Sequence, residues 1–101
     1  MIIIYPLKDK TCVENQSVKF EIELNKPELL KKLIWEKDGT QINLENIDDY
    51  ELKENGNKYL LTIKKAKFSD EGKYTVKILD TDVNSSANLS VSGSLKKTNN
   101  S

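Results

Sequence analysis

The chain contains no arginine, no histidine and a single cysteine among its 101 residues. Without guanidinium groups it lacks the usual bidentate ligand for phosphates and guanine edges, and without imidazole it lacks the usual general base near neutral pH. Cys12 has no second thiol for an internal disulfide and no histidine with which to bind a metal. The composition argues against nucleic-acid binding, catalysis, a metal site, a cofactor and a small-molecule substrate.

Charge and apolar runs are also limited. The sixteen lysines are balanced by sixteen acidic residues, so the net charge gives no attraction to nucleic acid or to an anionic membrane. The apolar N-terminal residues 1–6 are too short for a signal-peptide core or a membrane span, and we expect a strand there. A single thiol in a small domain favours a reducing compartment, which predicts a cytoplasmic location.

The clearest pattern that is present is alternation with a period of two. Between residues 18 and 24 apolar side chains alternate with charged ones, as in a half-buried strand. Further short strands are expected at residues 2–4, 10–13, 33–36, 42–44, 50–52, 59–63, 74–78 and 87–91. Residues 29–32 fit either a loop or a half-turn of helix. The sequence therefore predicts an all-β, two-sheet sandwich.

Glycine and polar residues mark the turns and the end of the domain. Asn55-Gly56 lies between two strand patterns and predicts a tight hairpin in which both central residues have positive φ. Residues 80–82 form a second reversal. One domain is expected over residues 1–92, and residues 93–101, with one apolar side chain, are expected to be a disordered tail or linker.

The stretch Asp70-Glu71-Gly72-Lys73-Tyr74 is the most specific motif of the chain. A tyrosine placed in this way after Asp-x-Gly is typical of a corner between strands, where the ring packs inward and the hydroxyl binds backbone a few residues upstream. The single Trp35 is its expected companion in the core.

Taken together, residues 20–24, 35–39, 59–63, 70–74 and 87–91 resemble an immunoglobulin intermediate-set (I-set) domain. The resemblance extends over about residues 4–92, and it is to the intracellular muscle-type domains of titin, myosin-binding protein C, obscurin and myomesin. It implies an antiparallel immunoglobulin-like sandwich without a core disulfide, because Ile22 and Val76 occupy the positions that are cysteines in extracellular relatives. The structural core that it implies consists of Ile22, Trp35, Leu61, Asp70, Gly72, Tyr74 and Val76.

The resemblance also implies a function. The expected function is that of a non-enzymatic structural or protein-interaction module in a muscle-type or cytoskeletal scaffold, acting as a spacer, docking surface or load-bearing unit in the sarcomere or cytoskeleton. Its expected partners are filament proteins or neighbouring immunoglobulin or fibronectin domains. If the segment around residues 11–13 pairs with the last strand, as in the family, the amide of Val13 is a candidate donor to a ladder that carries force.

An extracellular adhesion or receptor domain that has lost its disulfide is the alternative. Four Asn-x-Ser sequons support it, because such sites accept glycans in secreted proteins; they begin at Asn15, Asn84, Asn88 and Asn99.

Three other features have a structural and a functional interpretation. Cys12 is either a small, partly buried hydrophobe or a redox-sensitive thiol. Lys64, Lys65 and Lys67 either keep a strand end soluble or bind an acidic partner. The acidic pairs near residues 48, 70 and 80 do not follow a calcium-loop pattern, and we interpret them as solvated turns.

Overall fold

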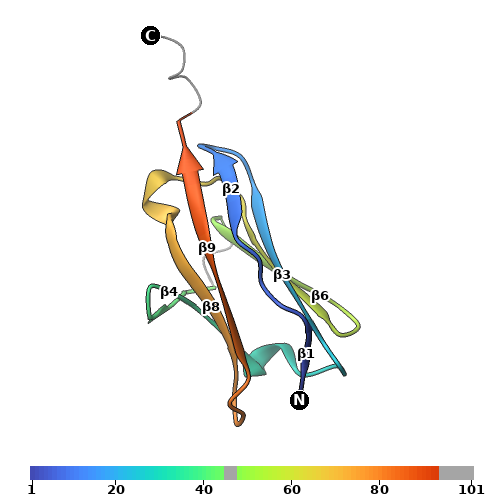
Figure 1. Cartoon of the computed structure of the whole chain (residues 1–101). Coiled ribbons are helices and arrows are strands. Elements are labelled where there is room, and N and C mark those ends of the chain that lie inside the picture. The colour runs from blue at the N-terminus through green and yellow to red at the C-terminus, as the bar shows by residue number, and fades with distance from the viewer. Residues whose placement is uncertain (45–47, 94–101) are drawn as a thin grey trace.

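The computed structural model describes residues 1–44 and 48–93, which fold into two packed β-sheets (Figure 1). The expected tail at 93–101 lies outside this part except for Gly93. The strands are β1 (Ile3–Tyr5), β2 (Lys10–Val13), β3 (Val18–Leu24), β4 (Leu33–Lys37), β5 (Thr40–Gln41), β6 (Tyr50–Asn55), β7 (Lys58–Ile63), β8 (Gly72–Ile78) and β9 (Asn84–Ser92). Two short 3₁₀ helices, η1 (Leu30–Lys32) and η2 (Phe68–Asp70), lie between strands.

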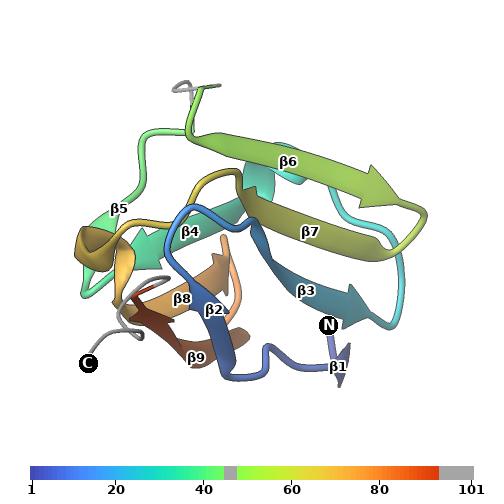
Figure 2. The ribbon, with the colours of Figure 1, turned by 90° about the horizontal axis from the view of Figure 1, so that it is seen from above.

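The two layers are seen end-on in Figure 2. One sheet has the strand order β1-β3-β7-β6 and the other the order β2-β9-β8-β4-β5. Among the described residues, the strand pairs are antiparallel except β2 with β9, which run parallel. The N-terminal part of the chain thus contributes β1 to one sheet and β2 to the other. The prediction of an all-β immunoglobulin-like sandwich is confirmed.

Alternation in the sequence accounts for the core between the sheets. Every second residue of β3 and of β9 is buried, and β8 follows the same rule from Tyr74 onward. The buried hydrophobic side chains are Leu7, Val18, Phe20, Ile22, Leu24, Leu33, Trp35, Ile42, Tyr59, Leu61, Ile63, Ala66, Tyr74, Val76, Ile78, Ala87, Leu89 and Val91. They form one continuous cluster, and this cluster fixes which face of each strand turns inward.

The strand expected at residues 42–44 lies earlier in the chain than the sequence pattern indicates. The structure has β5 at Thr40–Gln41, directly after the turn at Asp38 and Gly39, where it pairs with the end of β4. Ile42 is buried and donates its amide to the carbonyl of Trp35 at 2.9 Å, but it lies outside the strand. Positive φ at both Asp38 and Gly39 makes the turn tight, so pairing starts at once.

The hairpin expected at Asn55-Gly56 is also shifted by one residue. Asn55 pairs with Lys58, so the two central residues are Gly56 and Asn57. Gly56 has φ +64°, whereas Asn57 does not have positive φ. Positive φ at the first central residue alone is the pattern of a type II′ turn, which wants glycine there and places no such demand on the second position.

The ambiguous residues 29–32 are resolved as a helical turn. Residues Leu30–Lys32 form the single turn of η1, closed by a 2.9 Å hydrogen bond from the amide of Lys32 to the carbonyl of Leu29. The chain then enters β4, and Trp35 becomes fully buried between the sheets.

Candidate functional site

The corner before β8 is held by Tyr74. Its ring is completely buried and stacks on Phe20 with the ring centroids 5.0 Å apart. Its hydroxyl donates to the carbonyl of Asp70 at 2.6 Å, so the polar tip keeps a partner inside the fold. Burial, with the nearby Asp70 carboxylate, raises the pKa of the Tyr74 phenol well above its ordinary value. The buried phenol is therefore held in its neutral form.

Asp70 and Gly72 flank the corner and are half-buried, so they lie outside the buried cluster. The Asp70 carboxylate accepts the amide of Lys67 at 2.8 Å, which closes the first turn of η2. Gly72 has φ +152°, and a Cβ on it would lie 2.6 Å from Asp38 Oδ2. Asp70 and Gly72 therefore determine the course of the backbone through the corner, Asp70 by its hydrogen bond and Gly72 by its positive φ.

Four other residues expected in the core, Ile22, Trp35, Leu61 and Val76, have no exposed surface. Val76 lies opposite Trp35 on neighbouring strands, and Ile22 comes from the facing sheet. The indole Nε1 of Trp35 is buried and has no hydrogen-bond partner in the described part of the chain. Ile22 and Val76 thus belong to one buried cluster of aliphatic and aromatic side chains.

Cys12 is half-buried on β2 and is a free thiol. Burial, and then the Asp70 carboxylate, raises the pKa of this thiol above its ordinary value. Because the thiolate is the reactive form, this environment makes the thiol less reactive. The contacts of Cys12 fit a small hydrophobe packed against the core.

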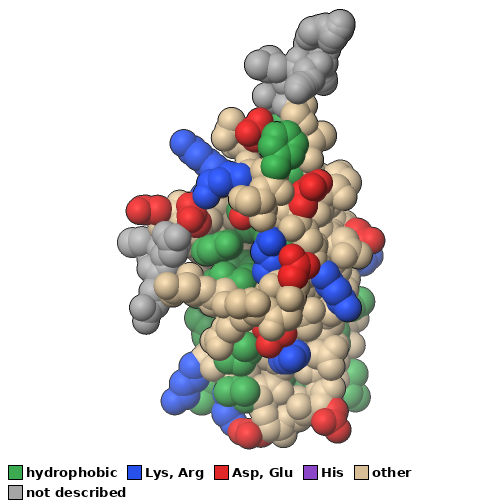
Figure 3. Space-filling model, turned by 90° about the vertical axis from the view of Figure 1, so that its left-hand side faces the viewer, with side chains coloured by type: hydrophobic (Ala, Val, Ile, Leu, Met, Phe, Trp, Pro, Cys, Tyr) green, Lys and Arg blue, Asp and Glu red, His purple; other side chains and the backbone are tan. Residues whose placement is uncertain are grey.

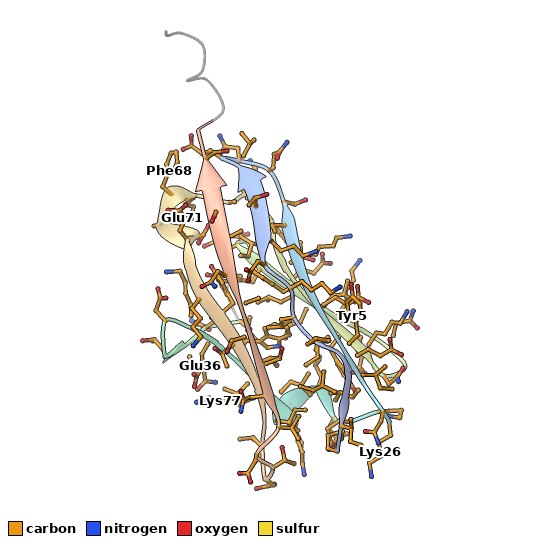
Figure 4. The ribbon with its side chains drawn as sticks, viewed as in Figure 1. Tyr5, Lys26, Glu36, Phe68, Glu71 and Lys77 are labelled. Atoms are coloured by element: carbon orange, nitrogen blue, oxygen red, sulfur yellow. The ribbon has the colours of Figure 1, made fainter. Side chains whose placement is uncertain are left out.

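The acidic residues singled out by the sequence make separate contacts. Glu71, the residue between η2 and β8, accepts the amide of Val91 on β9 at 2.8 Å (Figure 4). Asp80 forms an exposed ion pair with Lys32 at 3.6 Å. Within residues 1–44 and 48–93 there is no group of three or more side chains suited to a metal ion.

The lysine cluster near the end of β7 is partly compensated. The Lys67 ammonium lies 3.7 Å from a carboxylate oxygen of Asp49 and forms an ion pair with it. The backbone amide of Lys64 donates to the carbonyl of Asp49 at 2.9 Å, a bond that fixes the strand end and leaves the lysine charges unchanged. On the side of the molecule shown in Figure 3, blue and red side chains are interspersed and do not form a field of one sign. In the described part of the chain, no helix is long and apolar enough to cross a membrane.

The parallel pairing of β2 with β9 joins the first and last parts of the sandwich. Its register runs from Lys10 opposite Leu89 to Val13 opposite Ser92. Beyond the strand, the amide of Glu14 donates to the carbonyl of Ser92 at 2.7 Å. These contacts form the ladder that we call the terminal clamp, consisting of residues 10–14 and 88–92.

The pairing of residues 11–13 with the last strand is present, but the amide of the candidate donor Val13 does not donate to this ladder. That amide donates to Oε1 of Gln16 at 3.1 Å instead. Alternate residues of a strand direct their amides to opposite sides, and Glu14 is in phase with the ladder while Val13 is out of phase. Glu14 is therefore the donor established at this end of the terminal clamp.

Two side-chain bonds that the sequence did not predict fasten the segment between β1 and β2. The amide of Leu7 donates to Oγ of Ser85 at 3.0 Å in a buried position, and Asp9 Oδ1 accepts the amide of Asn88 at 2.8 Å. Both join residues almost eighty positions apart in the chain. No local pattern identifies such partners, because each is a single polar residue among many.

Comparison with known proteins agrees with this architecture. The model of the immunoglobulin I-set domain family matches residues 2–92. Cardiac-type myosin-binding protein C of Gallus gallus is 35% identical over 77 residues, which is 76% of this chain and 6% of that protein. A titin homolog of Caenorhabditis elegans is 35% identical over 80 residues, or 79% of this chain and, in rounded figures, 0% of that protein.

A solved structure of titin immunoglobulin domains also has the fold of this chain. The I9–I11 tandem from titin superposes with a TM-score of 0.82 and 25% identity, over 92% of this chain and 33% of that one. The chain spans only a small fraction of the length of the two curated relatives named above, myosin-binding protein C and the titin homolog. With its sandwich, its tyrosine corner and its parallel terminal pair, the chain belongs to the immunoglobulin I-set domain family.

Proposed function

We propose that this domain is a non-enzymatic structural module of a muscle-type or cytoskeletal scaffold, in which it acts as a load-bearing spacer. The similarity to cardiac myosin-binding protein C and to a titin homolog supports a place in such a scaffold. A cytoplasmic location in the sarcomere or cytoskeleton is part of the same proposal, and the free Cys12 is consistent with it.

The terminal clamp is the observation that carries this proposal. The N-terminus and the end of β9 lie at opposite ends of the sandwich (Figure 1). Because β2 and β9 run parallel, force on the two ends pulls these strands in opposite directions along their length. The hydrogen bonds between them are then loaded in shear and resist together, whereas a hairpin opened from one end loses its bonds one at a time.

Protein partners follow from the same proposal. Filament proteins, or neighbouring immunoglobulin or fibronectin domains of the same chain, would dock on the outer surfaces of the sandwich. Charges of both signs alternate there, as in the ion pair of Glu36 with Lys77 at 3.3 Å across β4 and β8 (Figure 4). Such a surface favours specific partners of matching pattern over nonspecific polyanions.

The alternative, an extracellular module without a disulfide, has one supporting observation. The sequon residues Asn15, Asn84 and Asn88 are all exposed, so a glycosylation enzyme would have access to them. Asn99 lies outside the described residues.

Peptide mass mapping of the native full-length protein distinguishes the two settings. Our proposal predicts unmodified asparagines at 15, 84 and 88 in a long chain with further domains of this kind. Glycans at any of these positions would overturn the cytoplasmic assignment and make the domain part of a secreted or cell-surface protein.

A further inference from the structure

The open side of the sheet that ends in β6 has a regular backbone pattern. In Figure 2, β6 is the outermost strand of its layer. Tyr50 lies opposite Ile63 in the β6–β7 register, so Asp49, the residue before Tyr50, lies opposite Lys64. The amide of Lys64 donates to the carbonyl of Asp49 at 2.9 Å, which makes this a hydrogen-bonded pair of the ladder. Odd-numbered residues of β6 therefore face β7, and the even-numbered ones direct their amides and carbonyls outward.

Three residues thus present backbone groups at this edge: Tyr50, Leu52 and Glu54. Outside the strand ladders, no backbone hydrogen bond among the described residues involves them. A row of free donors and acceptors on an edge strand is a template for another strand. The side chains of Tyr50 and Leu52 are half-buried at the rim of the core, so an added strand would also cover apolar surface.

The charges on the outer face of β6 indicate which strand fits. Glu51 and Lys53 lie side by side, with Lys53 Nζ 3.9 Å from Glu51 Oε2, and their side chains are 46% and 67% exposed. If a second copy of β6 pairs antiparallel with Leu52 opposite Leu52, then Glu51 of each copy faces Lys53 of the other. The sequence of β6 is thus complementary to itself in charge in this register.

The same register satisfies the backbone. Leu52 has outward groups, so two copies of Leu52 exchange both of their hydrogen bonds, and Tyr50 does the same with Glu54 of the other copy. If the second copy slips by one residue, the free amides and carbonyls of one strand lie opposite residues of the other whose amides and carbonyls already bond to β7. A slip by two residues places Glu51 against Glu51 or Lys53 against Lys53, and like charges opposite one another are unfavourable.

The other edge strands, β1, β2 and β5, are shorter than β6, and the longest of them, β2, has four residues. β1 is three residues long, with an irregular register against β3, and is followed by Pro6. β5 has only two residues. We propose that β6 is a self-association edge through which two copies of the domain pair about a two-fold axis, joining their four-stranded sheets into one.

Sedimentation velocity over a range of domain concentrations tests this proposal. The unaltered domain should show a reversible monomer–dimer equilibrium. Glu51→Lys or Lys53→Glu alone should raise the dissociation constant about tenfold or more, because both symmetry-related pairs become repulsive. The double exchange, Glu51→Lys with Lys53→Glu, should restore the dimer.

Mixing the two single variants, Glu51→Lys and Lys53→Glu, gives the most specific test of the charge pairing. One then carries two positive and the other two negative charges at these positions, so the equimolar mixture should dimerise although neither variant does so alone. Lys19→Glu changes the net charge by the same amount and sign as Lys53→Glu, but on an exposed residue of β3 inside the same sheet, and it should leave the dimer unchanged.

Hydrogen exchange identifies the edge that is used. With rising domain concentration the amides of Tyr50, Leu52 and Glu54 should become protected, while those of Glu51 and Lys53, already bonded to β7, should not change. A domain that stays monomeric at millimolar concentration would overturn the proposal. So would a dimer that survives both single variants, or protection confined to β1 or β2.

Discussion

Asp38 occupies the space that a side chain on Gly72 would need. A Cβ on Gly72 would lie 2.6 Å from Asp38 Oδ2 and 2.8 Å from Oδ1, closer than real Cβ contacts come. The Asp38 carboxylate is held there because Oδ1 accepts the amide of Lys73 at 2.9 Å, and the amide of Asp38 donates to the carbonyl of Lys73 at 2.8 Å. The β4–β5 turn is thereby fastened to the start of β8.

Gly72→Ala should therefore destabilise the domain. Positive φ and the contact with Asp38 act together, and we expect a loss of about 2–3 kcal/mol in the free energy of unfolding by urea. Gly56→Ala is the matched control, since Gly56 also has positive φ but a Cβ added to it would meet no described atom within 4 Å. A loss at Gly72 no larger than that at Gly56 would show that Asp38 imposes no steric limit.

The same carboxylate predicts a dependence of stability on acid. The hydrogen bond from the Lys73 backbone, followed by that from Lys37, lowers the pKa of Asp38 below its ordinary value of 3.8. A lowered pKa in the folded state adds stability that is present above the unfolded-state pKa and is lost as pH falls through the folded-state value.

Asp38→Asn should accordingly reduce stability at pH 7, and its difference from the unaltered domain should shrink below about pH 4. Urea unfolding at several pH values measures this difference. Asp82→Asn is the control, because that residue is exposed and its carboxylate makes no hydrogen bond within residues 1–44 and 48–93. A difference independent of pH would contradict the assigned role of the charge.

Tyr74→Phe isolates the hydroxyl of the tyrosine corner. The ring and its stacking on Phe20 remain, but the bond to the Asp70 carbonyl is lost, which should cost about 1–2 kcal/mol in unfolding experiments. Tyr5→Phe removes the hydroxyl of an exposed tyrosine and should change stability by less than about 0.5 kcal/mol. If Tyr74→Phe and Tyr5→Phe reduce the free energy of unfolding equally, the Tyr74 hydroxyl does not stabilise the corner.

Ile22→Ala tests whether packing supports the core where the disulfide is missing. Ile22 has no exposed surface, so its truncation should leave a cavity and cost about 2–4 kcal/mol in equilibrium unfolding. Ile4→Ala is the same substitution at a side chain that is 57% exposed and should have little effect. A shift below about 0.5 kcal/mol for Ile22 would contradict the proposed core.

Most of the fold could be predicted from the sequence, because burial leaves a direct mark on it. The alternation in β3 and β9 and the motif ending in Tyr74 set the two sheets and the inward faces. The position of β5 and the hairpin register depend on turn geometry, where a single residue decides the pairing. Side-chain patterns do not specify this difference.

The terminal clamp shows a second limit of the sequence. Side chains alternate between the faces of a strand while backbone amides alternate between its two neighbours, so the apolar pattern does not say which amide serves which neighbour. For that reason the resemblance to the family gave Val13 only as a candidate donor, whereas Glu14 is the donor in the structure. The long-range bond of Leu7 to Ser85 could not be predicted, because nothing local distinguishes Ser85 from other serines.

Glu14→Pro offers a clean change in the terminal clamp. The amide of Gln16 donates to the carbonyl of Val13 at 3.0 Å and Asn15 has φ +75°, as in a type II turn with Glu14 at its second position. Proline is favoured at that position, so the substitution should keep the turn and delete the bond from Glu14 to Ser92.

Single-molecule pulling on this variant through its two ends is the most direct test of a load-bearing role. We predict a lower unfolding force for Glu14→Pro than for the unaltered domain. Gln16→Ala, which removes the acceptor of the out-of-phase Val13 amide, should unfold at the unaltered force. An unchanged force for Glu14→Pro, or an equal fall in both variants, would contradict the claim that the pairing of β2 with β9 bears the load.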